Sequence, residues 1–260
     1  MKYTYIIAAL LALLAPLEAM SQNISLRSRS SLEADWKVSK GLHLSAEYEL
    51  RTADGLSGVE RHQFSLGLSY KLNKHFTAGA GYSYIGHFGS DGSFNPRHRM
   101  TVEMSYKLDK GDWRFSVKES LLLTHRAYDF NRFQQTPNAL ELKSRAKLSY
   151  RGSKNIEPYA YVELRNIFNG PSCSATYYSA AGTYGNYEFL GYKDVYVNRL
   201  RGAVGVEWKL NGQHSLDFYS MFDHCRDRVT DTNKSGTKLK SIAWESANRA
   251  SLCIGYKFSF

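Results

Sequence analysis

Apolar and polar residues alternate with a period of two along most of the chain. In one run Leu42, Leu44, Ala46, Tyr48 and Leu50 alternate with charged or polar residues. Comparable runs cover residues 24–38, 42–52, 61–72, 75–86, 97–108, 112–124, 139–151, 156–166, 196–210, 213–223 and 247–260. A two-residue period places one set of side chains on each face of a β-strand. The pattern therefore predicts an all-β fold.

The length of the runs and of their connections predicts the kind of sheet. Most runs are about ten to thirteen residues long, whereas spanning strands need about 9–11 residues and soluble strands average about 5–6. Short polar connections at 39–41, 73–74, 109–111, 152–155 and 211–212 alternate with longer segments at 52–60, 87–96, 125–138, 167–195 and 224–241. Tight periplasmic turns and long outer loops are typical of outer-membrane barrels. We predict a transmembrane antiparallel up-and-down β-barrel.

The number of strands is less well defined by the pattern. The runs number eleven, but bacterial single-chain barrels use even numbers. Either 24–38 lies outside the wall, which gives ten strands, or a further strand lies in 167–195 or 22–30, which gives twelve. We expect about twelve, with ten as the alternative. Glu119 falls on the apolar face of its run, which predicts a β-bulge nearby.

The two ends of the chain predict export and assembly. Lys2, an apolar run at 6–14 and the small residues around Met20 indicate a secretory signal peptide over 1–21, followed by a barrel domain over 22–260. At the other end Tyr256, Phe258 and Phe260 complete an alternating strand. This ending resembles the signal by which the outer-membrane assembly machinery recognises its substrates. The expected location is the bacterial outer membrane, with lipid and that machinery as partners.

Aromatic residues on the apolar faces gather near the tight turns. They include Trp36, Tyr70, Tyr106, Trp113, Tyr150 and Trp208. Rings of this kind favour the boundary between membrane and water, because they combine an apolar body with a polar tip. We interpret them as an aromatic girdle.

The opposite faces of the runs are strongly charged. By strand parity the interior would carry Glu47, Glu49, Arg51, Arg99, Glu103, Arg114, Glu141, Arg145, Glu163, Arg165, Arg199, Arg201 and Glu207. These residues could fill a narrow interior with salt bridges. Alternatively, they could line a passage that favours small anionic solutes. The net charge of +10 often indicates nucleic acid, but an exported chain would not meet it, so no nucleic-acid partner is expected.

Other candidate chemistry is weaker. The segment 167–195 contains Tyr177, Tyr178, Tyr184, Tyr187 and Tyr192 among small polar residues, which suits either a ligand- or glycan-binding surface or a loop folded onto the barrel mouth. A lipid hydrolase using Ser and His, such as His43 with Ser45 or His214 with Ser215, is a further alternative. No GxSxG motif is present, so we do not expect an enzyme.

Cysteines and metal ligands add little to the picture. Cys173 and Cys225 would both lie in outer loops, where a disulfide is permissible, while Cys253 would face the interior. No Cys/His spacing suggests zinc. The DTNKSG stretch at 231–236 opens like a calcium loop, but Ile242 occupies the twelfth position, where such a loop requires Glu. We expect no metal and no cofactor, and the oligomeric state is open.

Several features together resemble a known family. They are the signal, the ladder of hairpins, the final Phe and the strand ends Glu49-Leu50-Arg51 and Glu163-Leu164-Arg165. The chain resembles small outer-membrane barrels of Bacteroidota that form a family of unknown function. The resemblance implies a barrel in the outer membrane and no established activity or functional residues.

Overall fold

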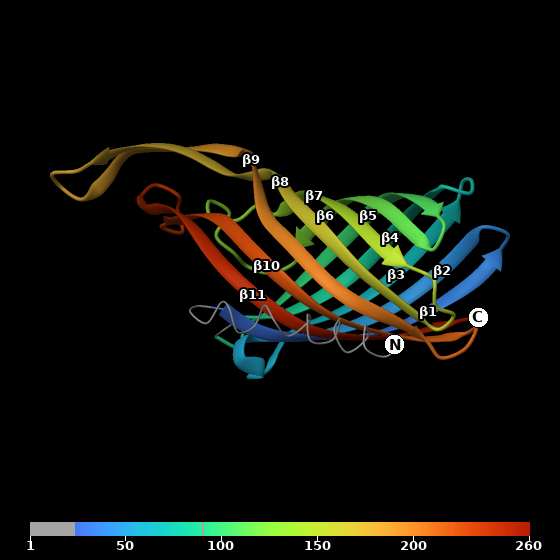
Figure 1. Cartoon of the computed structure of the whole chain (residues 1–260). Helices are drawn as coiled ribbons and strands as arrows, with labels where there is room; N and C mark the ends of the chain where they lie inside the picture. Colours follow the sequence, from blue (N-terminus) through green and yellow to red (C-terminus); the bar gives the residue numbers. More distant parts are fainter. Residues whose placement is uncertain (1–23, 90) are drawn as a thin grey trace.

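The fold is a closed β-barrel. The computed structural model describes residues 24–89 and 91–260, so the predicted signal peptide lies outside the described residues. Within them, eleven strands close into a barrel in the order β1-β11-β10-β9-β8-β7-β6-β5-β4-β3-β2 (Figure 1). The strands are β1 (Ile24–Ser39), β2 (Leu42–Thr52), β3 (Val59–Lys71), β4 (Phe76–Phe88), β5 (Phe94–Lys110), β6 (Trp113–Arg126), β7 (Asn138–Tyr150), β8 (Ile156–Tyr178), β9 (Thr183–Lys209), β10 (His214–Thr232) and β11 (Leu239–Ser259). The prediction of an all-β barrel is confirmed.

Helical structure is minor. The described part of the chain contains one short 3-10 turn, η1 (Asp54–Leu56). No helix in residues 24–89 and 91–260 is long and apolar enough to cross a membrane.

The expected strand count of about twelve, or ten, is corrected to eleven for the described residues. Residues 24–39 belong to the wall, because β1 pairs with β2 on one side and with β11 on the other. Successive strands run in opposite directions, so the first and last strands of an odd set run in the same direction. Accordingly, β1 and β11 form a parallel pair from Ile24↔Asn248 to Asp35↔Ser259, which we call the seam.

The alternation of residue types separates two surfaces. Large apolar side chains on the outer wall are exposed, as on β3, where about half the surface of Phe64, Leu68 and Tyr70 is accessible (47%, 48% and 50%). Glu49 and Glu163 on the inner wall are 1% and 2% exposed. An apolar outer surface around a charged interior is the reverse of the usual arrangement in a water-soluble domain.

The bulge expected near Glu119 is absent. β6 pairs with β5 and β7 in continuous register over its whole length. Glu119 therefore points outward and is exposed, and its carboxylate accepts a hydrogen bond of 2.6 Å from the Ser144 hydroxyl on β7. A hydrogen bond to a neighbouring strand, rather than a change of register, accommodates this charge.

The two ends of the barrel differ. Tight connections such as those after β1, β3 and β5 define what we call the turn end, and the opposite end is the loop end. Two segments expected to be loops are largely strand. Residues 168–195 continue β8 and β9 as a two-stranded ribbon with several register shifts, and it projects well beyond the rest of the loop end (Figure 1). β10 and β11 likewise extend to Thr232 and from Leu239.

One part of the interior is filled with aromatic and apolar side chains. Tyr159, Tyr161, Ala203, Met221 and Cys253 form a buried cluster against which Tyr219 packs. The ring of Tyr159 has room because Gly205 lies beside it. A Cβ on Gly205 would lie 2.8 Å from the Tyr159 hydroxyl and 2.5 Å from Cβ of Tyr219. This cluster narrows the lumen along β8–β11 and leaves space against β2–β5.

Candidate functional site

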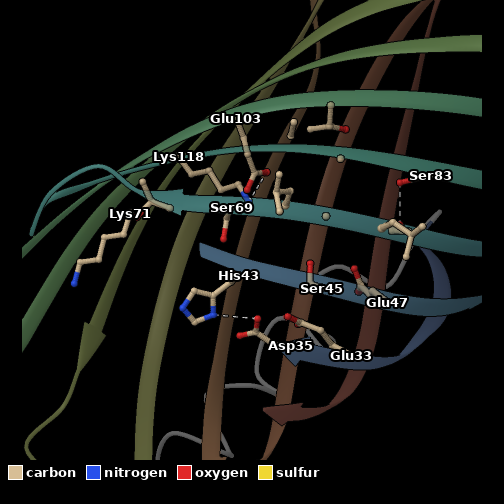
Figure 2. A pocket seen from close by; sticks show the side chains of 18 of the residues that line it. Glu33, Asp35, His43, Ser45, Glu47, Ser69, Lys71, Ser83, Glu103 and Lys118 are labelled. Carbon is tan, nitrogen blue, oxygen red and sulfur yellow. Dashed lines mark hydrogen bonds and ion pairs between the residues drawn. The ribbon is translucent and has the colours of Figure 1, made fainter. Parts of the chain in front are cut away.

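The turn end of the lumen contains a large water-accessible cavity, which we call the vestibule. Its volume is about 740 Å³. Figure 2 shows its charged lining, with Glu33, Asp35, His43, Glu47, Lys71, Glu103 and Lys118 on strands of the β1–β6 wall. The cavity exists because the inward positions of β2, β3 and β4 are small. They include Ser45, Ser65, Gly67, Ser69, Gly81 and Ser83.

Ion pairs in the vestibule are local and of both signs. Lys118 contacts Glu103 at 2.7 Å, and Lys257 contacts Glu33 at 2.8 Å and Asp35 at 3.4 Å. The His43 Nδ1 lies 3.3 Å from the Asp35 carboxylate. Most of these side chains remain partly accessible to solvent, so each pair contributes little to stability.

Beyond the vestibule, buried carboxylates are each shared by several arginines. Glu49 contacts Arg29, Arg51 at 2.5 Å and Arg61 at 3.6 Å. Glu163 contacts Arg145 at 2.6 Å, Arg199 at 3.4 Å and Arg201 at 3.6 Å. Asp223 likewise contacts Arg201 and Arg199, and a separate pair, Glu60 with Arg27, lies beside them and is less buried. We call these seven arginines and four carboxylates the arginine lattice.

The arginine lattice carries more positive than negative charge. Its seven guanidinium groups meet four carboxylates within 4 Å in the described part of the chain. The Nε atoms of Arg29, Arg61 and Arg199 are buried without a hydrogen-bond partner there. Removing charged donors from water without pairing them is unfavourable. The interior is therefore electrostatically suited to negatively charged groups.

Other inward cations at this level lack carboxylate partners. The Arg99 Nε donates to the Thr124 hydroxyl at 2.9 Å. In residues 24–89 and 91–260, no carboxylate oxygen lies within 4 Å of the Lys143 ammonium. Lys143 lines both the vestibule and a smaller cavity of about 80 Å³ beyond it. These side chains extend the positive potential toward the turn end.

The structure brings together most of the charged residues expected in the lumen. Glu49, Arg51, Arg145, Glu163, Arg199 and Arg201 belong to the arginine lattice, and Glu47, Arg99, Glu103 and Arg114 line the vestibule. Glu141 lies 3.6 Å from Arg165, and Glu207 lies opposite Glu157 in the β8–β9 register.

Sequence reasoning missed six residues in or beside the lattice. They are Arg27, Arg29, Glu60, Arg61, Asp223 and Arg249. The place of β1 in the wall was uncertain, Glu60 fell in a predicted loop, and Arg61, Asp223 and Arg249 lie at or near the ends of predicted strands. The sequence of β1 could have revealed two of them, because Arg27 and Arg29 alternate with outward Leu26 and Ser28 and therefore share the inward face.

Outward aromatic residues lie at both ends of the barrel. At the turn end the Trp113 and Tyr150 rings are 5.1 Å apart, Tyr106 lies 5.0 Å from Phe76, and Tyr70 and Trp208 are exposed. A second group of outward aromatic residues, which sequence reasoning missed, lies toward the loop end. There the Tyr48 and Tyr82 hydroxyls form hydrogen bonds with outward His62 and His98.

The C-terminal aromatic residues pack against the strands on both sides of β11. The Tyr256 hydroxyl is 2.5 Å from the His214 Nδ1, and Phe258 packs on Phe260 with ring centroids 4.2 Å apart. Trp36, on β1, stacks on Phe260. These contacts join β10, β11 and β1 at the turn end.

The tyrosines of segment 167–195 do not form one surface. Tyr177 and Tyr178 are exposed at the tip of the ribbon, and the Tyr184 ring lies 5.0 Å from that of Tyr177. The Tyr192 hydroxyl instead donates to the Arg132 carbonyl at 2.9 Å, and the Tyr187 hydroxyl is buried. The base of the ribbon packs on the loop end, while its tip remains accessible.

Several alternatives from the sequence do not assemble. Cys173, Cys225 and Cys253 are free thiols, and the expected loop positions are wrong, because Cys173 lies on β8 and Cys225 on β10. His214 and Ser215 occupy opposite faces of β10 because they are adjacent in a strand. At the 231–236 turn, the side-chain Oδ1 of Asn233 accepts hydrogen bonds from the backbone amides of Thr237 and Lys238. This is an Asx-type turn.

A closed barrel with an apolar outer wall and a charged, cation-rich lumen defines a porin-like β-barrel protein. The chain belongs to the family described as a protein of unknown function (DUF2490), whose model matches residues 30–234. The expected resemblance to a family of unknown function is confirmed, although the match does not address a Bacteroidota origin.

Solved structures that are similar to this chain include porins and an outer-membrane protein. A NanC porin is 14% identical, with a TM-score of 0.43 over 90% of this chain and 99% of that one. The outer-membrane OmpT of Vibrio cholerae is 11% identical, with a TM-score of 0.37 over 80% and 58% of the two chains. An anion-selective porin from Comamonas acidovorans is 11% identical, with a TM-score of 0.35 over 85% and 54%. None of the curated proteins matches the sequence.

Proposed function

We propose that this protein is a bacterial outer-membrane barrel, exported by a cleaved signal peptide, that passes small anionic solutes. The apolar outer wall supports the membrane location, because so large an exposed apolar surface would cause association in water. In hydrocarbon, a closed barrel satisfies its backbone hydrogen bonds internally. Outward aromatic and histidine side chains near both ends suit the two interfaces.

The cation excess of the arginine lattice carries the proposal of anion passage. A solute entering from the turn end first meets a vestibule of about 740 Å³ with charges of both signs. It then meets seven arginines that share four carboxylates. Rings of basic side chains favour anions in pores, and a narrow low-dielectric lumen strengthens that preference.

The same lattice limits the size of the solute. The guanidinium–carboxylate contacts line the wall of the lumen beyond the vestibule, mostly between neighbouring strands, and the aromatic cluster around Tyr159 and Tyr161 fills part of the interior. The passage is therefore narrow, and we expect a small unit conductance. We expect charged sugars larger than a monosaccharide to stop in the vestibule and not to pass.

Planar-bilayer recording under a salt gradient tests this proposal. The refolded full-length mature protein should give small, stable conductance steps with a reversal potential on the anion-selective side. A silent membrane with demonstrably folded protein, or a cation-selective reversal potential, would reject anion passage.

The exposed ribbon tip favours a second role as a surface ligand- or glycan-binding barrel. Tyr177 and Tyr178 are 57% and 47% exposed. Exposure of apolar ring surface to water is unfavourable, so a ligand that covers these rings would gain free energy from their burial. Binding of the purified protein to a glycan array, compared with a Tyr177→Ser/Tyr178→Ser variant, tests this role. Equal binding by the two proteins would exclude the ribbon tip as the glycan-binding surface. Neither proposed role includes a hydrolytic step.

A further inference from the structure

We propose that a cavity at the loop-end side of the arginine lattice is a binding site for a small dianionic oxyanion, of the phosphate or sulfate class. We call it the arginine cavity. The inference deepens the proposed anion passage, on which it rests for the route by which the ligand arrives. The lining includes Arg27, Arg29, Arg51, Arg199, Arg201 and Arg249.

The size of the arginine cavity suits one compact oxyanion. Its volume is about 40 Å³, whereas about 10–15 Å³ of such space holds one water molecule. The site therefore has room for a group equivalent to about three water molecules. That is sufficient for a tetrahedral oxyanion and too small for a sugar ring.

Unsatisfied donors line the arginine cavity. Arg29 and Arg199 both border it, and the Nε of each is buried without a hydrogen-bond partner in the described part of the chain. A buried charged donor left without a partner is costly. An oxyanion in the cavity would supply acceptors for donors that the protein itself leaves unpaired.

The one carboxylate that borders the cavity does not oppose an anion there. The Asp223 oxygens accept hydrogen bonds of 2.6 and 2.8 Å from the Nε and Nη2 of Arg201. This bidentate pair neutralises Asp223 locally. Arg249 borders the cavity from β11, and no carboxylate in residues 24–89 and 91–260 lies within 4 Å of it.

Guanidinium groups favour an oxyanion over a spherical halide. Their planar forks donate two parallel N–H bonds to oxygens of carboxylate, phosphate or sulfate. Charge-assisted bonds of this kind are about twice as strong as neutral ones. Several arginines around one small space therefore select for negative charge and for the geometry of oxygen acceptors. A dianion compensates more of the excess positive charge than a monoanion does.

The arginines of the cavity come from both sides of the seam. Arg27 and Arg29 lie on β1, Arg51 on β2 and Arg249 on β11, while Arg199 and Arg201 lie on β9. A bound oxyanion would therefore bridge the first and last strands. An oxyanion that binds the folded barrel and not the unfolded chain also raises the free energy of unfolding by mass action. Thermal stability therefore reports binding without a transport measurement.

Calorimetric titration of the folded full-length mature protein in detergent micelles tests the site. Sodium sulfate and inorganic phosphate, titrated at constant ionic strength against chloride and acetate, should give saturable binding for the two dianions. They should also raise the temperature at which the barrel unfolds on a gel. No saturable heat, or equal affinity for chloride and sulfate, would overturn the proposal.

A matched pair of variants locates the binding. Arg249→Gln removes a cavity guanidinium that has no carboxylate partner, so we expect at least a tenfold loss of sulfate affinity. Lys107→Gln removes the same charge in the vestibule and should leave sulfate affinity within twofold of the parent. Equal affinity in Arg249→Gln and the parent would overturn the assignment. If Arg249→Gln does not fold, Arg249→Lys, which keeps the charge and loses the fork, should still weaken sulfate at least threefold.

The failure of this site and the failure of anion passage are distinguishable. Saturable sulfate binding in micelles with silent bilayers would support the site and reject the passage. Anion-selective conductance without saturable binding of either dianion would support the passage and reject the site.

Discussion

The indole ring of Trp36 on β1 stacks on the ring of Phe260, with centroids 5.2 Å apart and planes inclined by 13°. The amide of Phe260 donates a 2.8 Å hydrogen bond to the carbonyl of Asp35. The last residue of the chain is thus bonded and stacked against the first described strand. The alternation that runs to the C-terminus therefore completes the seam.

Phe260→Ala should weaken the seam. Aromatic pairs contribute about 0.5–1.5 kcal/mol beyond the area they bury, so we expect the barrel to lose about 1–2 kcal/mol of unfolding free energy and to refold in lower yield. Urea unfolding in detergent, followed by the gel shift between folded and unfolded protein, measures both. Phe260→Tyr keeps the ring and serves as the control; identical stability of the Ala variant and the parent would contradict the role of the stack.

Gly205→Ala should destabilise the interior cluster. The added methyl would meet Cβ of Tyr219 at 2.5 Å and the Tyr159 hydroxyl at 2.8 Å, and overpacking of this kind costs about 1–3 kcal/mol. Gly202→Ala is the matched control on the same strand, because nothing lies within 4 Å of the Cβ it would add. The same urea titration should separate the two variants, and equal midpoints would refute the packing argument.

Glu163→Gln should destabilise the barrel and increase its anion selectivity. The change removes the one carboxylate that contacts Arg145 and leaves Arg199 and Arg201 with Asp223 alone. Loss of one partner of a buried ion pair costs about 3–5 kcal/mol. Urea midpoints and bilayer reversal potentials measure the two effects. Glu188→Gln, on the exposed ribbon, should change neither, and a stable Glu163→Gln barrel would show that the lattice is not structurally important.

Lys143→Gln should reduce anion selectivity without a large loss of stability. Its ammonium borders the vestibule and the cavity beyond it, where one charge acts on a passing ion by about 1 kcal/mol in a watery lumen. The anion-to-cation permeability ratio should fall by about fivefold. Lys154→Gln, exposed in the β7–β8 turn and absent from the vestibule lining, tests whether any loss of positive charge suffices. An equal fall in both variants would argue against a selective position at Lys143.

Much of the wall could be predicted from the sequence. The period of two along β2, β3 and β5 reports directly which side chains face outward, because adjacent residues of a strand must occupy opposite faces. The charged residues on Glu49-Leu50-Arg51 and Glu163-Leu164-Arg165 were assigned to the interior by the same rule. Strand number was wrong because the even-number rule was preferred to the pattern itself, which already contained β1.

The vestibule and the ribbon were beyond this reasoning for different reasons. The vestibule depends on summed side-chain volume around a closed ring, and small inward residues such as Ser45 and Gly67 indicate space only once their neighbours are known. The ribbon has register shifts between Ile167 and Thr176, which interrupt the alternation that marks a strand. Its abundance of Gly, Ser and Asn made it resemble a loop.

The seam also constrains the order of biogenesis. Lys257 and Glu33, which form an ion pair across it, are 224 residues apart in the chain, so bringing them together carries a large entropic penalty. In the membrane location proposed above, the sheet has two edges whose backbone groups hydrocarbon cannot satisfy until β11 is in place. A polypeptide that lacks β11 is therefore expected to be degraded by proteases, so that completion of this one parallel strand pair decides whether the barrel persists.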